Sequence, residues 1–201
     1  PLDAVPTSLS FAVAATAVAV VVGMCAAYVI SRRGSRLSQV FDVVLMLPLG
    51  TSAVTIGFGF LIALDWPIDL RATVALVPLA HALVAVPFVV RATVPLMRSI
   101  HPSVREAAAM LGASPGRVFR YIDLPIVARA ALVGAGFAFV VSLGEFGATA
   151  FIARPNTVTI PVMIFRLLGR PGLGNFAAAL ALAIVLGAIT AAAIVILDRF
   201  R

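Results

Sequence analysis

The chain has 201 residues, of which 62% are hydrophobic and only 11% are charged, and its mean hydropathy is +1.14. About a quarter of the residues of a soluble globular domain are charged, so this composition excludes a soluble protein and predicts an integral membrane protein. All fifteen basic residues are arginines scattered over several connections. We therefore expect no nucleic-acid partner, although the net charge is +7.

Five segments are long and apolar enough to cross a bilayer, since a helix needs roughly 20 apolar residues to cross a hydrocarbon core of about 30 Å. They cover residues about 9–30, 43–64, 72–90, 130–153 and 176–197. We therefore expect an all-α fold, a polytopic membrane protein with five transmembrane helices in one domain over residues 1–201. Proline and glycine within the spans favour a bundle that lines a pathway, because neighbouring helices or water must satisfy the freed backbone groups.

The distribution of arginine predicts the orientation of the chain, because cytoplasmic loops carry an excess of basic residues. The first connection carries Arg32, Arg33 and Arg36. If it is cytoplasmic, that side holds eleven arginines and the other side holds four, namely Arg71, Arg154, Arg166 and Arg170. We therefore expect the N-terminus outside and the C-terminus in the cytoplasm.

The connection between the third and fourth spans predicts two short helices joined by a tight turn. Ser103 and Glu106 have the spacing of a capping box at the start of the first helix. Gly112 permits the backbone conformation that ends it, and Ser114-Pro115 can start the second helix. On that second helix Arg117 adds a cationic side, which suits a groove in another protein.

Within residues 101–125, Glu106-Ala107-Ala108 is followed after three residues by Gly112, and nine residues later by Ile122-Asp123-Leu124-Pro125. This order and spacing resembles the cytoplasmic EAA loop of permease subunits of ATP-binding-cassette (ABC) importers. In that family the first helix of the loop inserts into a cleft of the ATP-hydrolysing subunit. With Arg117 added for its charge, the implied coupling residues are Glu106, Ala107, Ala108, Gly112, Arg117, Ile122, Leu124 and Pro125.

The resemblance also implies the partners. They are two ABC ATPase subunits, a second permease half or copy, an extracellular or periplasmic solute-binding protein, and the lipid bilayer of a bacterial inner membrane. The chain contains no lysine, so it cannot form a phosphate-binding loop that ends in Lys-Ser or Lys-Thr. We therefore expect a transport subunit that is no enzyme and binds no cofactor, with ATP and magnesium on the partner.

Two further strings look most like iron(III)- and thiamine-type permeases, namely HALVAVPF at residues 81–88 and SLGEFGAT at residues 142–149. Because such permeases often fuse two homologous halves, we expect the C-terminal half of a longer permease. The start at Pro1, without a Met or a basic leader, agrees with this expectation. The EFGAT string also looks like molybdate and sulfate permeases, which is the alternative substrate class.

Ser142, Glu145 and Thr149 fall on one stripe of the predicted fourth span. An ionisable group within a span is costly and marks either a pathway or a buried pair. Both interpretations stay open: the stripe faces the translocation pathway, or Glu145 pairs with an arginine or a helix end. His81 in the third span is interpreted first as an interhelical hydrogen bonder and second as a pathway residue. With His101 in the loop there is no cluster of histidines, so we expect no metal site.

The connection over residues 154–174 would face outward and contain a short helix. Thr159-Ile160-Pro161 places a proline in the first turn, and Gly169 would end the helix. Two interpretations stay open for it, an amphipathic helix on the outer leaflet or a docking site for the solute-binding protein.

Two other function classes compete with the importer subunit. One is an intramembrane enzyme that uses Glu145 and His81 as an acid–base pair, and the other is an ion-driven secondary carrier. Neither class explains the loop over residues 101–125.

Overall fold

The computed structural model describes residues 2–32, 36–64, 69, 71, 73–154 and 157–199, and these residues form helices and no strands. Arg33 and Arg201, two of the arginines on which the predicted orientation rests, lie outside the described residues. In chain order the elements are α1 (Ala4–Arg32), α2 (Arg36–Gly50), α3 (Ala53–Ala63), α4 (Leu76–Ser99), α5 (Pro102–Met110), α6 (Pro115–Val118), the π-helical segment η2 (Phe119–Asp123), α7 (Leu124–Gly144), α8 (Gly147–Ile152), α9 (Ile160–Leu168) and α10 (Leu173–Asp198).

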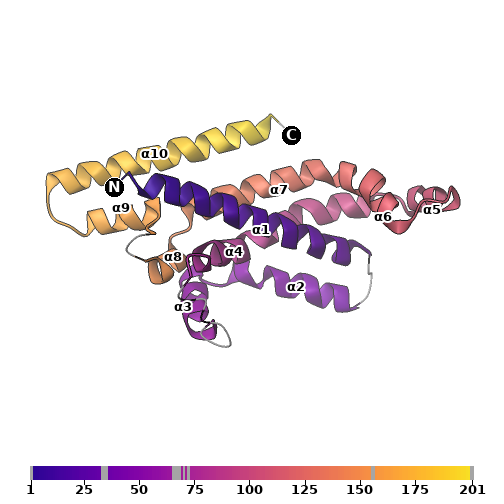
Figure 1. The fold of residues 1–201 in the computed structure, drawn as a ribbon, viewed down its shortest axis with the longest axis horizontal. Helices are drawn as coiled ribbons and strands as arrows, with labels where there is room; N and C mark the ends of the chain where they lie inside the picture. The colour runs from indigo at the N-terminus through magenta and orange to yellow at the C-terminus, as the bar shows by residue number, and fades with distance from the viewer. Residues whose placement is uncertain are drawn as a thin grey trace.

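The centre of the molecule is a bundle of the three long helices α1, α4 and α7, which lie side by side (Figure 1). Val89 of α4 is fully buried between Gly23 of α1 and Gly134 of α7. A Cβ atom on Gly23 would lie 2.7 Å from Val89 Cβ, and one on Gly134 would lie 2.9 Å from Val89 Cα. Small residues at both contacts therefore permit close helix packing, as is typical of membrane helices.

The predicted spans 9–30 and 176–197 coincide with α1 and α10, which are long and apolar enough to cross a membrane. The helix at the third predicted span, 72–90, is α4, which covers Leu76–Ser99. It begins later than predicted and ends nine residues further along the chain. Pro87 and Pro95 lie inside α4 without ending it. Neighbouring helices in a membrane bundle tolerate such prolines, which is why the apolar pattern alone gave the wrong end for this helix.

The helix predicted over residues 43–64 is broken in the structure. Helices α2 and α3 are bent by 108° at Thr51 and Ser52. Pro48 lies in the last turn of α2, where it removes a backbone donor, and Ser52 is extended with a ψ of 131°. The described residues thus hold four helices that are long and apolar enough to cross a membrane, or five spans if the bent pair counts as one.

The predicted fourth span, 130–153, is wrong at both ends. The helix is continuous from Pro115 through η2 to Gly144, and Glu145 is extended with a ψ of 116°. Helix α8 then begins at Gly147 and packs across α3. A Cβ atom on Gly57 of α3 would lie 2.7 Å from the Cα and the carbonyl oxygen of Ala148, so these two short helices touch backbone to backbone.

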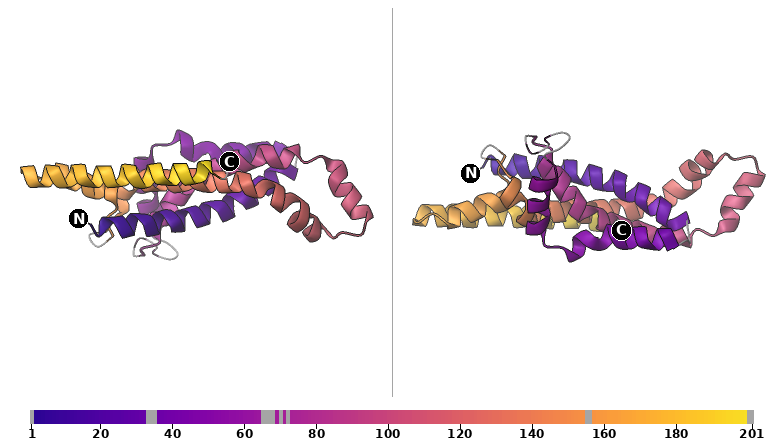
Figure 2. Two further views of the ribbon diagram at one scale, coloured as in Figure 1. Left: turned by 90° about the horizontal axis from the view of Figure 1, so that it is seen from above. Right: turned by 90° about the horizontal axis from the view of Figure 1, so that it is seen from below.

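The two ends of the molecule are built differently (Figures 1 and 2). At one end, α5 and α6 project beyond the bundle. At the other end lie the N-terminus and α9, joined by a 2.7 Å hydrogen bond from Ile160 N to Ser8 Oγ. The predicted helix start at Thr159-Ile160-Pro161 and its end at Gly169 are confirmed. Helix α10 then runs back toward the end that carries α5.

Candidate functional site

The connection over residues 101–125, called the elbow below, projects from one end of the bundle (Figure 2). Its first helix, α5, begins at Pro102 with His101 as the N-cap. The backbone N–H of Ser103 donates to His101 Nδ1 at 3.3 Å, and Ser103 Oγ lies 2.7 Å from the same nitrogen. The predicted capping box of Ser103 and Glu106 is therefore wrong, because Pro102 starts the helix one residue before Ser103 and an imidazole replaces the hydroxyl as the cap.

The turn after α5 is a Schellman motif centred on Gly112. Gly112 N donates to Ala109 O at 2.9 Å, and Ala113 N donates to Ala108 O at 3.0 Å. Gly112 has a φ of +80°, where an L residue with a side chain is strained. The predicted role of Gly112 in ending the helix is confirmed, and the motif fixes the direction of the chain at the tip.

The second arm of the elbow is the start of one continuous helix, Pro115–Gly144, that is long enough to cross a membrane, in contrast to the separate short helix predicted. Ser114 is its N-cap, and the Ser114 carbonyl accepts from Arg117 N at 2.9 Å. The arm continues through η2, whose wider turn is closed by a bond from Leu124 N to Phe119 O. The wide turn lies directly before Pro125, which has no N–H and whose ring would collide with the Tyr121 carbonyl in a regular α-helix.

The tip of the elbow carries two bare apolar side chains. Met110 is 91% exposed and Leu111 is 89% exposed. Glu106, Ala107 and Gly112 are exposed beside them, and no residue of α5 is buried. Met110 and Leu111 were not among the predicted coupling residues. The signal for them in the sequence is a pair of large apolar residues directly before the glycine that ends the helix.

Of the remaining predicted coupling residues, Ala108 lies on α5 and the others lie along the second arm. Arg117, Leu124 and Pro125 are exposed, Ala108 is half-buried at the turn, and Ile122 is half-buried against the main core. The structure therefore leaves Glu106 and Ala107 exposed on the first arm and Gly112 exposed at the tip. It places Leu124 and Pro125 further down, beside η2 and closer to the bundle.

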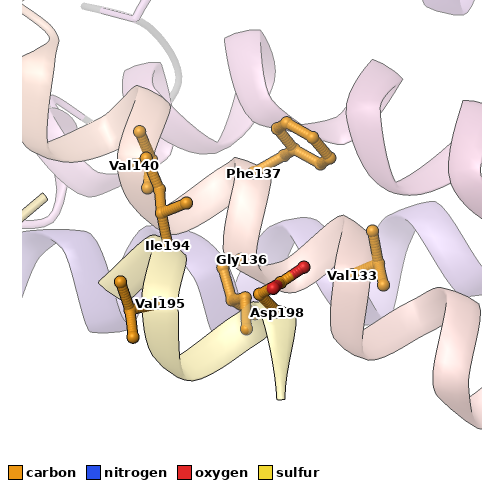
Figure 3. A pocket seen from close by; sticks show the side chains of 8 residues that line it. Val133, Gly136, Phe137, Val140, Ile194, Val195 and Asp198 are labelled. Carbon is orange, nitrogen blue, oxygen red and sulfur yellow. The ribbon is translucent and has the colours of Figure 1, made fainter. Parts of the chain in front are cut away.

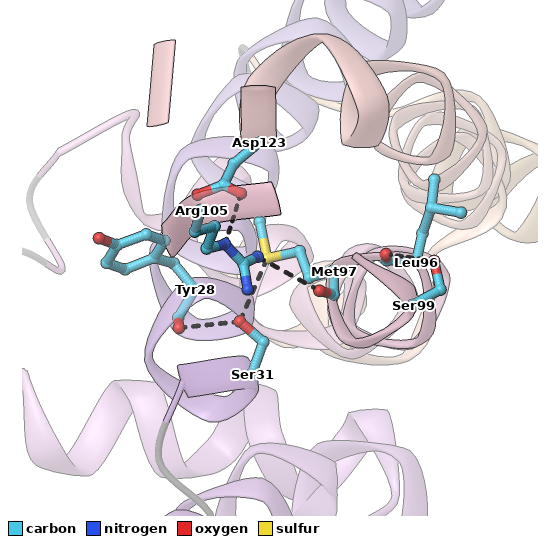
Figure 4. A network of polar contacts seen from close by, with 7 residues as sticks. All are labelled: Tyr28, Ser31, Leu96, Met97, Ser99, Arg105 and Asp123. Atoms are coloured by element: carbon cyan, nitrogen blue, oxygen red, sulfur yellow. Dashed lines mark hydrogen bonds and ion pairs between the residues drawn. The ribbon is translucent and has the colours of Figure 1, made fainter. Parts of the chain in front are cut away.

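The base of the elbow is attached to three bundle helices by a cluster of contacts, called the joint below (Figure 4). Arg105 Nε of α5 donates to Asp123 Oδ1 of η2 at 2.8 Å, and Arg105 Nη2 lies 3.5 Å from the carbonyl oxygen of Met97 in α4. Ser31 Oγ of α1 lies 3.6 Å from Met97 Sδ. The ring of Phe119 meets that of Tyr28 in α1 edge to face at 5.3 Å.

A second polar cluster lies in the bundle interior and is called the hub below. His81 of α4 is buried, with Nδ1 2.7 Å from Ser142 Oγ of α7 and Nε2 2.6 Å from Thr149 Oγ1 of α8. Thr149 Oγ1 donates to the Glu145 carbonyl at 3.3 Å, so the hydroxyl accepts from Nε2–H and Nδ1 accepts from Ser142. The interpretation of His81 as an interhelical hydrogen bonder is confirmed.

Glu145 lies in the break between α7 and α8, where its carboxylate caps the start of α8. Oε1 accepts from the backbone N–H of Ala148 at 2.7 Å. The predicted continuous stripe of Ser142, Glu145 and Thr149 is thus interrupted, yet Ser142 and Thr149 both contact His81, and the Glu145 carbonyl accepts from Thr149. All four side chains are buried within this chain. Their role as pathway residues stays a prediction.

An apolar groove runs along the outside of the bundle between α7 and α10 (Figure 3). It has a volume of about 450 Å³, is lined mainly by Val133, Phe137, Val140 and Ile194, and has Asp198 at its edge. Most of α10 is exposed and apolar. This face is suited to lipid and offers a polar solute almost no hydrogen-bonding groups.

Three comparisons with known proteins agree with one another. The family described as "Binding-protein-dependent transport system inner membrane component" matches residues 19–201. PhnV of Salmonella typhimurium strain LT2, described as a 2-aminoethylphosphonate transport system permease protein, is 31% identical over 198 residues, 98% of this chain and 74% of PhnV. The Haemophilus influenzae molybdenum transport system permease protein ModB is 32% identical over 209 residues, 94% of this chain and 90% of ModB.

The Escherichia coli K12 putrescine transport system permease protein PotI is 32% identical over 172 residues, 82% of this chain and 60% of PotI. Among solved structures, the fold is similar to an inward facing conformation of the MetNI methionine ABC transporter. The TM-score is 0.77, the identity is 14%, and the match covers 98% of this chain and 94% of the other.

Proposed function

Because the chain belongs to the family of binding-protein-dependent transport system inner membrane components and is an ABC importer permease, we propose that its elbow docks into an ATPase subunit. ATP binding and hydrolysis on that partner then move the helices that form the solute pathway. The chain itself is a non-enzymatic transport subunit. ATP and magnesium stay on the partner.

The exposed tip of the elbow is the observation that carries this proposal. Met110 and Leu111 project from the bundle on a helix with no buried residue. Large apolar side chains that lie exposed together at the end of a protrusion are typical of protein interaction sites. The flexible Met110 side chain can adapt to an irregular groove, and Glu106 offers a carboxylate to a basic residue there.

The fixed geometry of the turn supports the same role. A protrusion transmits movement only if it keeps its shape under load. The two hydrogen bonds of the Schellman motif and the left-handed Gly112 hold the tip rigid. Ala107 and Ala108 keep the surface of α5 close to the backbone, so a groove can approach the helix closely.

The expected assembly has two ATPase subunits, a second permease half or copy and a solute-binding protein outside. In that assembly the elbow faces the cytoplasm, and the N-terminus and α9 lie at the outer surface. The opposite placement of elbow and α9 in the fold supports this orientation. Helix α9, with Phe165 and Leu168 exposed, suits either the outer leaflet or the solute-binding protein.

Two substrate classes are proposed, and they have different support. The strings at residues 81–88 and 142–149 predict iron(III) or thiamine. Molybdate or sulfate, the alternative, has support from ModB, which matches nearly its whole length, and from the sulfate permease CysW of Synechocystis, 29% identical over 158 residues. Titration of the cognate solute-binding protein with iron(III), thiamine, molybdate, sulfate, 2-aminoethylphosphonate and putrescine, by calorimetry, separates these classes.

Docking is tested by co-purification of the ATPase subunit with the chain from the host membrane. Glu106→Lys and Gly112→Arg are expected to weaken the association by about tenfold or more, since each loss of about 1.4 kcal/mol is tenfold in affinity. Asp3→Lys is the matched control, because it makes the same charge change at an exposed acidic residue at the opposite end. If both elbow variants keep the ATPase bound and its hydrolysis coupled to uptake, the proposal is wrong.

Orientation is tested with a cysteine at Ala109, which is exposed on α5, in a Cys25→Ala background. A membrane-impermeant maleimide added to intact cells should not label this cysteine, whereas inverted membrane vesicles should label it. Labelling from outside would place the elbow on the wrong face for an ATPase.

A further inference from the structure

A helix that transmits force needs a stiff attachment, and α5 by itself has none. It is joined to α4 through Ile100 and His101 and to α6 through the turn at residues 111–114. None of its residues is buried. Held only by these two links, α5 could tilt on the bundle when a partner pushes it, and the movement would be lost before it reached the spans.

Arg105 supplies the missing attachment from the middle of α5. Its guanidinium reaches across the elbow to Asp123, with 2.8 Å between Nε and Oδ1. The Asp123 side chain is 2% exposed and that of Arg105 is 24% exposed, so water is largely excluded from the contact. Opposite charges attract each other more strongly in such a partly buried contact than on an exposed surface, which favours the closed pair.

The wide turn of η2 explains why Asp123 is buried. Tyr121 and Leu124 on either side are exposed, while Asp123 points into the protein. The π-helical segment adds one residue to the turn and so changes which side chain faces inward. The same segment aims Phe119 at Tyr28 of α1.

From the ion pair, contacts continue into two further helices (Figure 4). Arg105 Nη2 lies 3.5 Å from the Met97 carbonyl of α4, and the Met97 sulfur lies 3.6 Å from Ser31 Oγ of α1. The joint therefore connects α5 to all three helices, α1, α4 and α7, at the ends that we expect to face the cytoplasm.

We propose that Arg105 and Asp123 are positioning residues that fasten the elbow to α1, α4 and α7 as one rigid unit, so that movement of α5 turns all three helices. The inference rests on the proposed function, because it assumes that a partner moves α5. Neither residue has to touch that partner. Arg117, exposed on the second arm, is by contrast available to the partner surface.

Pulsed electron paramagnetic resonance on the chain in nanodiscs tests the attachment. Spin labels go on cysteines at Ala109 of α5 and at Val21 of α1, both exposed, in a Cys25→Ala background. We expect one narrow distance distribution in the parent chain. Arg105→Gln should broaden it about twofold, because the buried pair is broken, and Arg105→Lys, which keeps the charge, should restore most of the narrow distribution.

Arg91→Gln is the matched control. Arg91 also pairs with a carboxylate, Asp42 at 3.5 Å, but it links α2 to α4 away from the joint. It should leave the distribution unchanged. If Arg105→Gln is not recovered folded, Asp123→Asn replaces it with the same expectation. A narrow distribution in the Arg105→Gln or Asp123→Asn chain overturns the inference.

The same labels in the complex with the ATPase subunit separate this inference from the proposed function. With ATP and vanadate, the parent α5–α1 distance should stay constant, and in Arg105→Gln it should shift while the ATPase remains bound. Equal behaviour of both chains, with the ATPase bound at the elbow, overturns only the role of the joint. An ATPase that never binds the elbow overturns the proposed function, whatever the distance distribution of the chain alone.

Discussion

The elbow and the hub are both polar regions of an apolar chain, but they use their polar groups in opposite ways. In the elbow, Glu106 and Arg117 face solvent, and the backbone satisfies its own hydrogen bonds through the turn at Gly112. In the hub, His81, Ser142 and Thr149 are buried and satisfy one another across three helices. Polar groups that bind another protein have to be exposed, whereas polar groups that join helices of the same chain are buried between them.

This contrast gives a general expectation. Substitutions in the hub and around the α7–α8 break should cost stability of the chain in detergent or nanodiscs. Substitutions of exposed side chains at the tip of the elbow should leave stability almost unchanged and remove coupling. The following predictions test that division from the largest expected effect on stability to the smallest.

Gly57→Leu should have the largest effect, about 3 kcal/mol, since it forces α3 and α8 apart where their backbones touch. The loss is measured as a lower free energy of unfolding in mixed micelles. Gly59→Leu is the matched control on the same helix. A Cβ atom on Gly59 would meet nothing within 4 Å, so equal losses for both variants would show that the backbone contact carries no stability.

His81→Leu should cost about 2 kcal/mol, because it removes two interhelical hydrogen bonds that are worth about 1 kcal/mol each in a membrane protein. Chemical denaturation measures the loss. Thr149→Val should cost about half as much, since it removes one of the two bonds.

Thr93→Val provides the control for the hub. Thr93 is buried on the same helix as His81, and its Oγ1 has no hydrogen-bond partner among the described residues. Its replacement should be neutral or slightly stabilising. If Thr93→Val costs as much stability as Thr149→Val, the loss in Thr149→Val comes from removing a buried hydroxyl and not from breaking its hydrogen bond to His81.

Gly112→Ala should cost about 1 kcal/mol, because it places a side chain at a left-handed φ of +80°. The strain should loosen the tip without unfolding the bundle, and hydrogen exchange of the Gly112 and Ala113 amides should report it as faster exchange. Gly116→Ala, four residues further on in α6, should not speed the exchange of these amides. Unchanged exchange in Gly112→Ala would contradict the assigned role of the turn.

Met110→Gln with Leu111→Gln should have the smallest effect on stability, within about 0.5 kcal/mol, since both side chains are almost fully exposed. Binding of the ATPase subunit should nevertheless fall by about tenfold or more, the effect of losing about 1.4 kcal/mol. Co-purification and thermal unfolding measure the two quantities on the same sample. Loss of stability without loss of binding would show that Met110 and Leu111 stabilise the fold, as the hub does, and do not bind the ATPase subunit.

Local sequence chemistry predicted the parts of the fold that local interactions determine. The long apolar runs identified α1 and α10, Pro161 marked the start of α9, and Gly112 marked the end of α5. The order and spacing of Glu106, Ala107 and Gly112 indicated the family, and the structure leaves these residues exposed on the projecting elbow.

Features that depend on distant contacts were missed. The apolar pattern continues through the α7–α8 break and gives no sign of it. The break depends on two contacts, namely Glu145 capping α8 and α8 packing against Gly57. The bend between α2 and α3 likewise has apolar residues on both sides. Arg105 and Asp123 lie eighteen residues apart across a turn whose geometry the sequence leaves open, so nothing in the sequence predicted their pairing.

Val89, enclosed by Gly23 and Gly134, limits how the transporter can change shape. The backbones of α1 and α7 both close on Val89, so turning α4 about its own axis would press other α4 side chains against those backbones. Packed interfaces of this kind resist gradual deformation. We therefore expect any change of shape in the assembled importer to move these three helices as a block, with sliding at their borders with α2, α3 and α10.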